Sequence, residues 1–233
     1  MRIAYFSEVF LPKIDGVVNT LLRLFEYLEE NDHESMLFVP HSSIPSASST
    51  QIITYKSFPL VLYPNVWGSF PSTERTIAYL KDFQPDLVHL INPAHFDIAG
   101  LKAAKILDIP VVASYQTDFP GYAKTLGLGF LEKPIWKFFR NIHNQAELNL
   151  APSNITRDQM LENGIERVKV WRRGIDMEHF SPQNRDPEMR NYLSGGIPDK
   201  PLLLYVGRLS PEKRVDWLAD VFEAGLDVRL AFV

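Results

Sequence analysis

Residues 2–39, RIAYFSEVFLPKIDGVVNTLLRLFEYLEENDHESMLFV, contain two short apolar runs separated by a helix-like stretch. The runs at residues 2–6 (RIAYF) and 35–39 (SMLFV) have the composition of buried strands. Between them, over residues 17–30, apolar side chains recur at the three- and four-residue spacing of one helical face. A strand, a helix and a second strand in this order predict a parallel βαβ unit.

The same alternation continues to about residue 175. Further strands are expected at residues 52–55, 86–90 (DLVHL), 111–114 (VVAS), 148–152 and 168–170. Further helices are expected at residues 71–83, 95–107 and 132–150, with another opening at Pro152 and Ser153; residues 40–50 are expected to be loop. We therefore predict that residues 1–175 form one doubly wound, Rossmann-like α/β domain.

The amino-acid composition of the sequence changes after residue 175. Proline and glycine recur in the polar stretch 176–200. This composition predicts an interdomain linker with one short helix at 187–193. From residue 201 a second α/β unit is expected, with strands at 202–206 and 228–233 around a helix at 211–224. Two strands cannot bury both faces of a sheet, so we expect this chain to hold only the start of a second domain. The alternative is that this last unit extends the first sheet.

Composition excludes several classes of protein. The 233 residues are 45% hydrophobic and 22% charged, which is ordinary for a globular protein and excludes disorder, collagen and coiled coil. A net charge of −4 argues against a general nucleic-acid binder. The absence of cysteine excludes disulfides, zinc–thiolate sites and a cysteine nucleophile. With no secretory signal and no apolar run of membrane-spanning length, the expected location is the cytoplasm, with any membrane contact peripheral.

The positions of the histidines do not indicate a metal site. The six histidines are scattered and no two show ligand spacing, so neither a metal nor a cofactor is expected. His89 lies in a predicted strand and is expected to be buried with its hydrogen bonds satisfied. The sequence also lacks a Walker-type loop, a G-x-G-x-x-G motif and a G-x-S-x-G elbow.

Two loops at predicted strand ends hold candidate site residues, because ligands of doubly wound sheets bind beyond the carboxyl ends of the strands. Gly16 stands at the start of the first helix, where a phosphate could approach backbone N–H groups; equally, it is a loop glycine needed for its dihedral angles. Gln116 and Asp118 follow the strand VVAS and could bind substrate hydroxyl groups, although Asp118 could simply cap the next helix.

Two basic segments are further candidates. Arg208 and Lys213, in VGRLSPEKR, lie near a predicted helix start and suit a diphosphate, or else form a solvated basic helix end. Over residues 121–145, Lys133, Lys137 and Arg140 alternate with aromatic residues that include Trp136. Cations among large aromatics suit the headgroup region of an anionic membrane; the alternative, favoured by composition alone, is an amphipathic core helix with a basic outer face.

Taken in order, these segments resemble the family 4 retaining glycosyltransferases of GT-B fold. The resemblance runs along the whole chain and is carried by RIAYFSEVFLPKIDGVVNTL, SYQTDFPGY, LAPSNITRDQML, VWRRGIDMEHFSP and YVGRLSPEKRVD. Trp171 in VWRRGID and the segment FLEKPIWKF resemble the lipid-directed branch, which includes sulfoquinovosyl-diacylglycerol synthases and related mannosyl- and glucosyltransferases.

The resemblance implies an acceptor-side domain, a nucleotide-sugar domain and a hexosyl transfer from a UDP- or GDP-linked sugar to a membrane lipid such as diacylglycerol or a glycolipid. It places Gly16 near the donor diphosphate, Arg208 and Lys213 on that diphosphate, and Gln116 and Asp118 near the reacting sugar. Two features depart from the family. Many members carry histidine where Gln116 stands, and the acidic E-x7-E region would lie beyond Val233, so this chain alone is expected to lack full activity.

Two other functions stay open. The chain could be a non-catalytic half-protein that binds a partner subunit, or a transferase for a soluble sugar or polysaccharide acceptor. The aromatic and basic segment around Trp136 separates the lipid acceptor from the soluble one.

Overall fold

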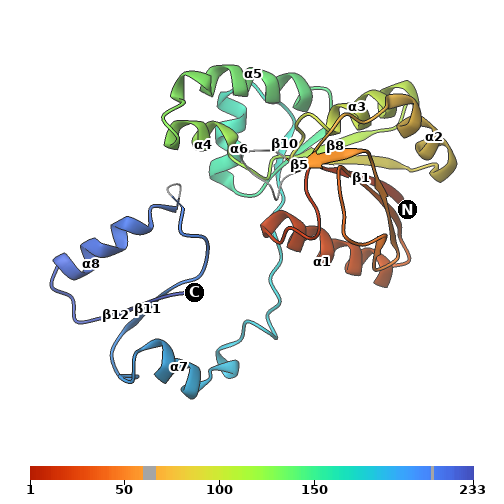
Figure 1. The fold of residues 1–233 in the computed structure, drawn as a ribbon. Helices are drawn as coiled ribbons and strands as arrows, with labels where there is room; N and C mark the ends of the chain where they lie inside the picture. The colour runs from red at the N-terminus through yellow and green to blue at the C-terminus, as the bar shows by residue number, and fades with distance from the viewer. Residues whose placement is uncertain (60–66, 211–212) are drawn as a thin grey trace. The chain divides into compact units, whose positions relative to one another are not determined.

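The computed structural model describes residues 1–59, 67–210 and 213–233, and the chain divides into two compact units (Figure 1). Unit 1 comprises Met1–Gly121 and Phe130–Arg173, and unit 2 comprises Tyr122–Gly129 and Gly174–Val233. Each unit has its own sheet. The assignment of residues 1–175, 176–200 and 201–233 to an acceptor domain, a linker and a donor domain stays a prediction.

Unit 1 is built on a mostly parallel sheet. Within the described residues its strand order is β10-β9-β8-β7-β1-β2-β4-β3, and only the β3–β4 pairing is antiparallel. The strands are β1 (Arg2–Ser7), β2 (Glu34–Val39), β3 (Ser46–Ala47), β4 (Thr50–Thr54), β7 (Leu87–Ile91), β8 (Val111–Ser114), β9 (Leu148–Ala151) and β10 (Val168–Val170). The predicted doubly wound α/β architecture is confirmed.

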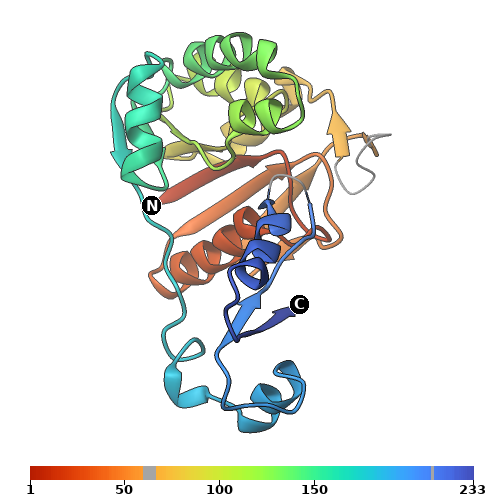
Figure 2. The same cartoon turned by 90° about the vertical axis from the view of Figure 1, so that its left-hand side faces the viewer.

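Helices cover both faces of this sheet (Figures 1 and 2). The helices of unit 1 are α1 (Gly16–Glu30), α2 (Thr73–Phe83), α3 (Asp97–Ile106), α5 (Glu132–His143) and α6 (Asn154–Glu162). Alternation along β1 shows the two layers: Ala4 and Phe6 pack with α2 and α3, whereas Ile3 and Tyr5 pack with α1. A smaller core cluster joins α5 and α6 through Trp136, Phe139 and Met160.

Helix starts follow the capping chemistry of the sequence. Asp15 accepts hydrogen bonds from the backbone N–H groups of Val17 (2.9 Å) and Val18 (3.0 Å) at the start of α1. Ser72 and Ser153 cap α2 and α6 in the same manner, through Arg75 N and Thr156 N. The predicted openings of these two helices are confirmed.

Unit 1 departs from the sequence predictions in three places. The helix expected over 132–150 ends at His143, because the buried Asn149 side chain accepts from His143 Nδ1 (2.7 Å) and donates to the backbone carbonyls of His143 and Glu166. Two short strands that the sequence did not indicate, β5 (Ser57–Pro59) and β6 (Trp67–Ser69), pair antiparallel. The expected loop at 40–50 contains β3 and the first residue of β4.

Unit 2 has a small parallel sheet of its own. Strand β11 (Leu202–Tyr205) pairs with β12 (Arg229–Phe232), so the alternative in which this unit extends the first sheet is wrong. Its helical elements are η2 (Pro182–Asn184), α7 (Pro187–Leu193), η4 (Val215–Ala219) and α8 (Asp220–Glu223). The helix at 187–193 is confirmed. Of the helix expected over 211–224, residues 211 and 212 lie outside the described residues, and the rest is mostly the 3-10 helix η4 followed by one turn of α-helix.

Two further helical segments, α4 (Phe119–Thr125) and η1 (Gly129–Leu131), connect β8 to α5. Among the described residues, no helix combines the length and the apolar character needed to cross a membrane.

Candidate functional site

The loops at the carboxyl edge of the unit 1 sheet carry several polar side chains. Strand β1 pairs with β2 on one side and with β7 on the other, so the chain reverses its direction across the sheet between β1 and β7. In doubly wound sheets a crevice for ligands forms at this reversal, beyond the ends of the strands. Glu8 follows β1, Asn92 follows β7, Gln116 follows β8, and Arg173 lies three residues after β10.

Arg173 joins two of the residues predicted from the sequence. Its Nε and Nη2 atoms donate to Gln116 Oε1 at 3.2 and 2.6 Å. A Cβ atom built on Gly16 would lie 2.6 Å from Arg173 Nη1. The guanidinium group therefore lies against both the amino end of α1 and the loop after β8, and Gly16 leaves room for it.

Asn92 holds the loop that carries Gln116. Its Oδ1 accepts hydrogen bonds from the backbone N–H groups of Gln116 (3.0 Å) and Thr117 (2.9 Å). Asn92 has a φ of 60°, in the left-handed region that asparagine tolerates better than most residues. The side chain is buried, so these two bonds fix the backbone at the end of β8.

Asp118 has the capping contact that the sequence left as an alternative. Its Oδ1 accepts from the backbone N–H of Gly121 (3.0 Å) in α4 and from the Tyr115 hydroxyl (3.3 Å). The side chain is exposed, so a second contact with a substrate is compatible with capping. Its role beside a sugar stays a prediction.

Two carboxyl groups, those of Glu8 after β1 and Asp97 at the start of α3, interact with one another. Burial raises the pKa of Glu8 to about 7, although backbone N–H groups of Phe96, Asp97 and Ala94 act in the opposite direction. Asp97, fully buried at the first residue of α3, has both carboxyl oxygens without a hydrogen-bond partner. Burial and the charge of Glu8 raise the pKa of Asp97 well above its usual value. Both causes favour the neutral form of Asp97.

His89 is a buried structural histidine, as predicted. Its Nε2 lies 2.6 Å from Ser114 Oγ, and burial lowers the pKa of the imidazole to about 3. The ring of Trp171 lies beside it, with centroids 5.8 Å apart. Trp171 also donates its backbone N–H to Ala151 O (2.8 Å), which ties down the segment that leads to Arg173.

Helix α5 separates the four residues that the sequence grouped as a membrane contact. Trp136 is 8% exposed and stacks on Tyr115, with ring centroids 5.6 Å apart, so it is a core residue and its ring does not face a membrane. Lys133 and Lys137 are exposed on the outer side of α5. Arg140 is also exposed, but its side chain lies beside Gly164 in the turn after α6.

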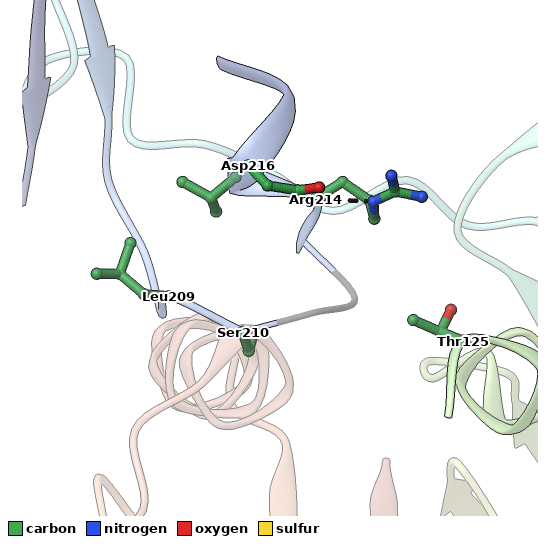
Figure 3. Close-up of a pocket in the computed structure, with 6 residues that line it drawn as sticks. Thr125, Leu209, Ser210, Arg214 and Asp216 are labelled. Atoms are coloured by element: carbon green, nitrogen blue, oxygen red, sulfur yellow. Dashed lines mark ion pairs between the residues drawn. The ribbon is translucent and has the colours of Figure 1, made fainter. Parts of the chain in front are cut away.

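Arg208 and Lys213 belong to unit 2, in the segment after β11. Both are exposed. Figure 3 shows Arg214 and Asp216 directed toward one another in the same segment, where they form an ion pair of 3.5 Å. Arg214 also lies over the ring of Trp217, 4.0 Å from its centroid. Arg214 is thus engaged within unit 2, and the roles of Arg208 and Lys213 on a diphosphate stay predictions.

Sequence reasoning missed Arg173, Asn92, Glu8 and Asp97. Arg173 stands 57 residues from Gln116, so no local pattern relates them. Asn92 had a signal, since an asparagine directly after an apolar strand is often a positive-φ turn residue. The described residues contain no group of three or more side chains able to hold a metal ion.

Comparison with known proteins agrees with this architecture. The model of Glycosyltransferase Family 4 matches residues 14–179. A GDP-mannose-dependent alpha-mannosyltransferase of Mycobacterium tuberculosis is 36% identical over 240 residues, covering 100% of this chain and 62% of the relative. The sulfoquinovosyl transferase SQD2 of Arabidopsis thaliana is 32% identical over 237 residues, covering 100% of this chain and 46% of the relative.

Among solved structures, HepE of Anabaena in complex with UDP-glucose has a similar fold. Its TM-score is 0.64 at 16% identity, over 100% of this chain and 68% of that one. The chain spans less than two thirds of the length of the two curated relatives. The family match includes the ends of β7, β8 and β10, from which the Gln116–Arg173 cluster is built. With its doubly wound GT-B type sheet and this match over most of its length, the chain belongs to Glycosyltransferase Family 4.

Proposed function

We propose that this protein is a retaining glycosyltransferase that moves a sugar from a UDP- or GDP-linked donor to a membrane lipid, such as diacylglycerol or a glycolipid. The family match over residues 14–179 is the observation that carries the proposal, because this range holds most of the polar loop edge of unit 1. The names of the mannosyltransferase and the sulfoquinovosyl transferase support a sugar transfer, and the former names GDP-mannose as donor.

In the proposed reaction the bond between the sugar and the diphosphate breaks, and a bond to the acceptor hydroxyl oxygen forms on the same face of the sugar. The acceptor proton passes to the leaving diphosphate. Arg208 and Lys213 would neutralise the charge that develops on this leaving group, which is the main electrostatic task of the step. Gly16 would lie near the diphosphate, and Gln116 and Asp118 near the sugar. No metal or cofactor is assigned to the reaction.

The direct test supplies the protein with radiolabelled UDP- and GDP-sugars in the presence of lipid extracts. Transfer of label to the lipid phase, with the anomeric configuration of the donor retained, is the expected result. If no donor is bound, hydrolysed or transferred by the protein or by a version extended to the length of its relatives, the proposed function is wrong.

The outer side of α5 supports a lipid acceptor over a soluble one. Phe130, in η1 just before α5, is 75% exposed, and Phe138, within α5, is 40% exposed; Lys133 and Lys137 of α5 are exposed as well. Exposed aromatic rings beside lysines suit the headgroup region of an anionic bilayer, where the rings insert and the ammonium groups meet phosphates. Trp136 takes no part in this surface because it packs in the core.

Vesicle flotation tests this surface. The variant K133E/K137E should lose binding to vesicles of anionic phospholipid and keep its melting temperature, because both side chains are exposed. The variant K81E/K102E changes the net charge equally on α2 and α3 and should bind as the wild type does. Arg140 is left intact because its side chain contacts the turn at Gly164. Wild-type binding by K133E/K137E would show that this surface is not the membrane contact, and no vesicle binding by the wild type or either variant would favour a soluble sugar acceptor.

The second candidate function is a non-catalytic module that binds a partner subunit. The two-stranded sheet of unit 2 is the observation that favours it, since β11 and β12 carry exposed apolar side chains such as Leu204 and Phe232. A monodisperse monomer in sedimentation would count against this candidate. The cytoplasmic location stays a prediction in either case.

A further inference from the structure

We propose that Arg173 is a positioning residue that fixes the carboxamide of Gln116, so that Gln116 presents its NH2 group, a hydrogen-bond donor, to an oxygen atom of the substrate. The inference rests on the proposed function for the identity of the substrate. It rests on the structure for the orientation of Gln116.

Donor and acceptor chemistry decides this orientation. A guanidinium group has five N–H donors and no acceptor, so it can face only the oxygen of a carboxamide. Arg173 directs two of these donors, Nε at 3.2 Å and Nη2 at 2.6 Å, to the same Oε1 atom. Hydrogen bonds from a charged donor are about twice as strong as neutral ones, so the flipped carboxamide is disfavoured.

The backbone of Gln116 is held as firmly as its side chain. Asn92 Oδ1 accepts from the Gln116 N–H at 3.0 Å, and Asn92 is itself buried. On the other side, Arg173 Nη1 occupies the space beside Gly16. Gln116 is therefore fixed at its backbone and at Oε1, and within the described part of the chain no hydrogen bond holds its Nε2 atom away from a ligand.

A fixed NH2 group can only donate hydrogen bonds, so its partner must be a hydrogen-bond acceptor. It donates to a hydroxyl oxygen of the sugar or to an oxygen of the diphosphate, and it repels a group that can only donate. The same logic accommodates histidine at this position, since a neutral imidazole also offers one N–H. Arg173 thus acts on the substrate through Gln116 and by itself is not a catalytic residue.

The decisive variant is Q116E. A glutamate at this position keeps both hydrogen bonds from Arg173 and strengthens them by its charge, but it has no N–H to offer. We expect Q116E to melt at or above the wild-type temperature and to lose about 10- to 100-fold in kcat/KM, which corresponds to about 1.4–2.7 kcal/mol of transition-state stabilisation. Wild-type kcat/KM in Q116E would overturn the proposal.

A double-mutant cycle tests the role of Arg173. R173A should lower kcat/KM about tenfold, because the Gln116 carboxamide can then rotate, and Q116A/R173A should be no worse than Q116A alone. R172A, which removes the neighbouring arginine, is the matched control and should leave kcat/KM unchanged. Fully additive losses would show that the two residues act independently and would overturn the proposal.

Nuclear magnetic resonance of the side-chain NH2 group separates this proposal from the proposed function, because it needs no activity. The Gln116 Nε2 signals, identified by their loss in Q116A, should shift in R173A and stay in place in R172A. If the signals are unmoved in R173A, the positioning role is wrong even for an active enzyme. If they shift but no donor sugar is ever transferred, the proposed function fails and the positioning role stands.

The binding of UDP and GDP without a sugar distinguishes the two oxygen sources. If Q116A weakens binding of the nucleotide-sugar and leaves the free diphosphate unaffected, the NH2 group acts on the sugar. If binding of both is weakened to the same extent, it acts on the diphosphate. If binding of neither changes and kcat/KM is also unchanged, the NH2 group meets no substrate oxygen and the proposal is wrong.

Discussion

The carboxylate of Glu8 accepts a hydrogen bond of 2.6 Å from the backbone N–H of Phe96, the residue before α3. This contact connects the end of β1 with the loop after β7 and brings Glu8 near the buried Asp97. Both carboxyl groups have pKa values above their ordinary ones, Glu8 at about 7. The pair therefore makes the stability of unit 1 depend on pH.

For acids with a raised pKa, the folded state binds protons more tightly than the unfolded state, so stability falls as pH rises. The loss should begin near the ordinary values of 3.8 and 4.5 and continue for Glu8 to about pH 7. D97N should therefore raise the melting temperature at pH 8 by several degrees, at about 2–4 °C per kcal/mol, and by less at pH 5. D82N, at an exposed aspartate, is the control. A D97N protein that melts lower than the wild type at pH 8 would contradict this account.

Gly16 gives a case in which stability and activity should separate. In G16A the new methyl group would meet the tip of the Arg173 side chain, which can move aside. Stability should be unchanged or up to about 1 kcal/mol higher, because alanine restricts the unfolded chain. Activity should fall about tenfold with the displacement of Arg173 from Gln116. Thermal melts and kcat/KM together check this, and wild-type activity in G16A would contradict it.

In contrast to G16A, substitution of Gly100 by alanine should lower stability. A Cβ at this position would lie 2.6–2.8 Å from ring atoms of Phe6, which is 1% exposed and stacked on Phe38 with centroids 4.4 Å apart. The ring cannot yield, so G100A should lose about 1–3 kcal/mol through overpacking, despite the better helix propensity of alanine. Denaturant unfolding measures the change. G129A, where the nearest atom is 4.0 Å away, serves as control.

Trp136 tests the core packing of α5. Its burial and its stacking on Tyr115 predict that W136A loses about 3–5 kcal/mol of stability, and that W136F loses less. A loss below 1 kcal/mol in W136A would indicate that the ring is free to act elsewhere. Urea unfolding followed by circular dichroism is the measurement.

Arg208 and Lys213 test the proposed charge neutralisation. Replacing either by alanine should lower kcat about 100- to 1000-fold, because each would stabilise the leaving diphosphate in the transition state. K200A removes a surface ion pair with Asp227 in the same unit and should have little effect on kcat. Single-turnover rates with a nucleotide-sugar decide between these outcomes, and equal rates in all three variants would remove the assignment.

Much of unit 1 could be predicted because its central strands, β1, β2, β7 and β8, are buried on both faces and therefore read as short apolar runs. The runs at 2–6, 86–90 and 111–114 became β1, β7 and β8, each within a residue of its expected bounds. The strands β5 and β6 have only three residues each and no such run, so nothing in the local pattern indicated them. The end of α5 at His143 depends on Asn149, a tertiary contact that propensity does not reveal.

The sequence indicated some residues of the candidate site one at a time, and it did not indicate their clustering. Gly16 and Gln116 were indicated by their places at a helix start and a strand end. Their connection through Arg173 was not, because it requires the register of β8, β9 and β10. Asp118 and Trp136 were each given two interpretations, and the contacts of the folded chain, a helix cap and a core ring, belong to the simpler one in both cases.

The dihedral angle and the two bonds of Asn92 limit which amino acids that position can accept. Glycine adopts the angle but offers no side-chain oxygen, and aspartate offers the oxygen but brings a charge into a buried place. Glutamine is one carbon too long and lacks the tolerance of asparagine for positive φ. Among distant sequences, an asparagine here directly after an apolar strand therefore serves as a marker of chains that shape the loop after β8 in the same way.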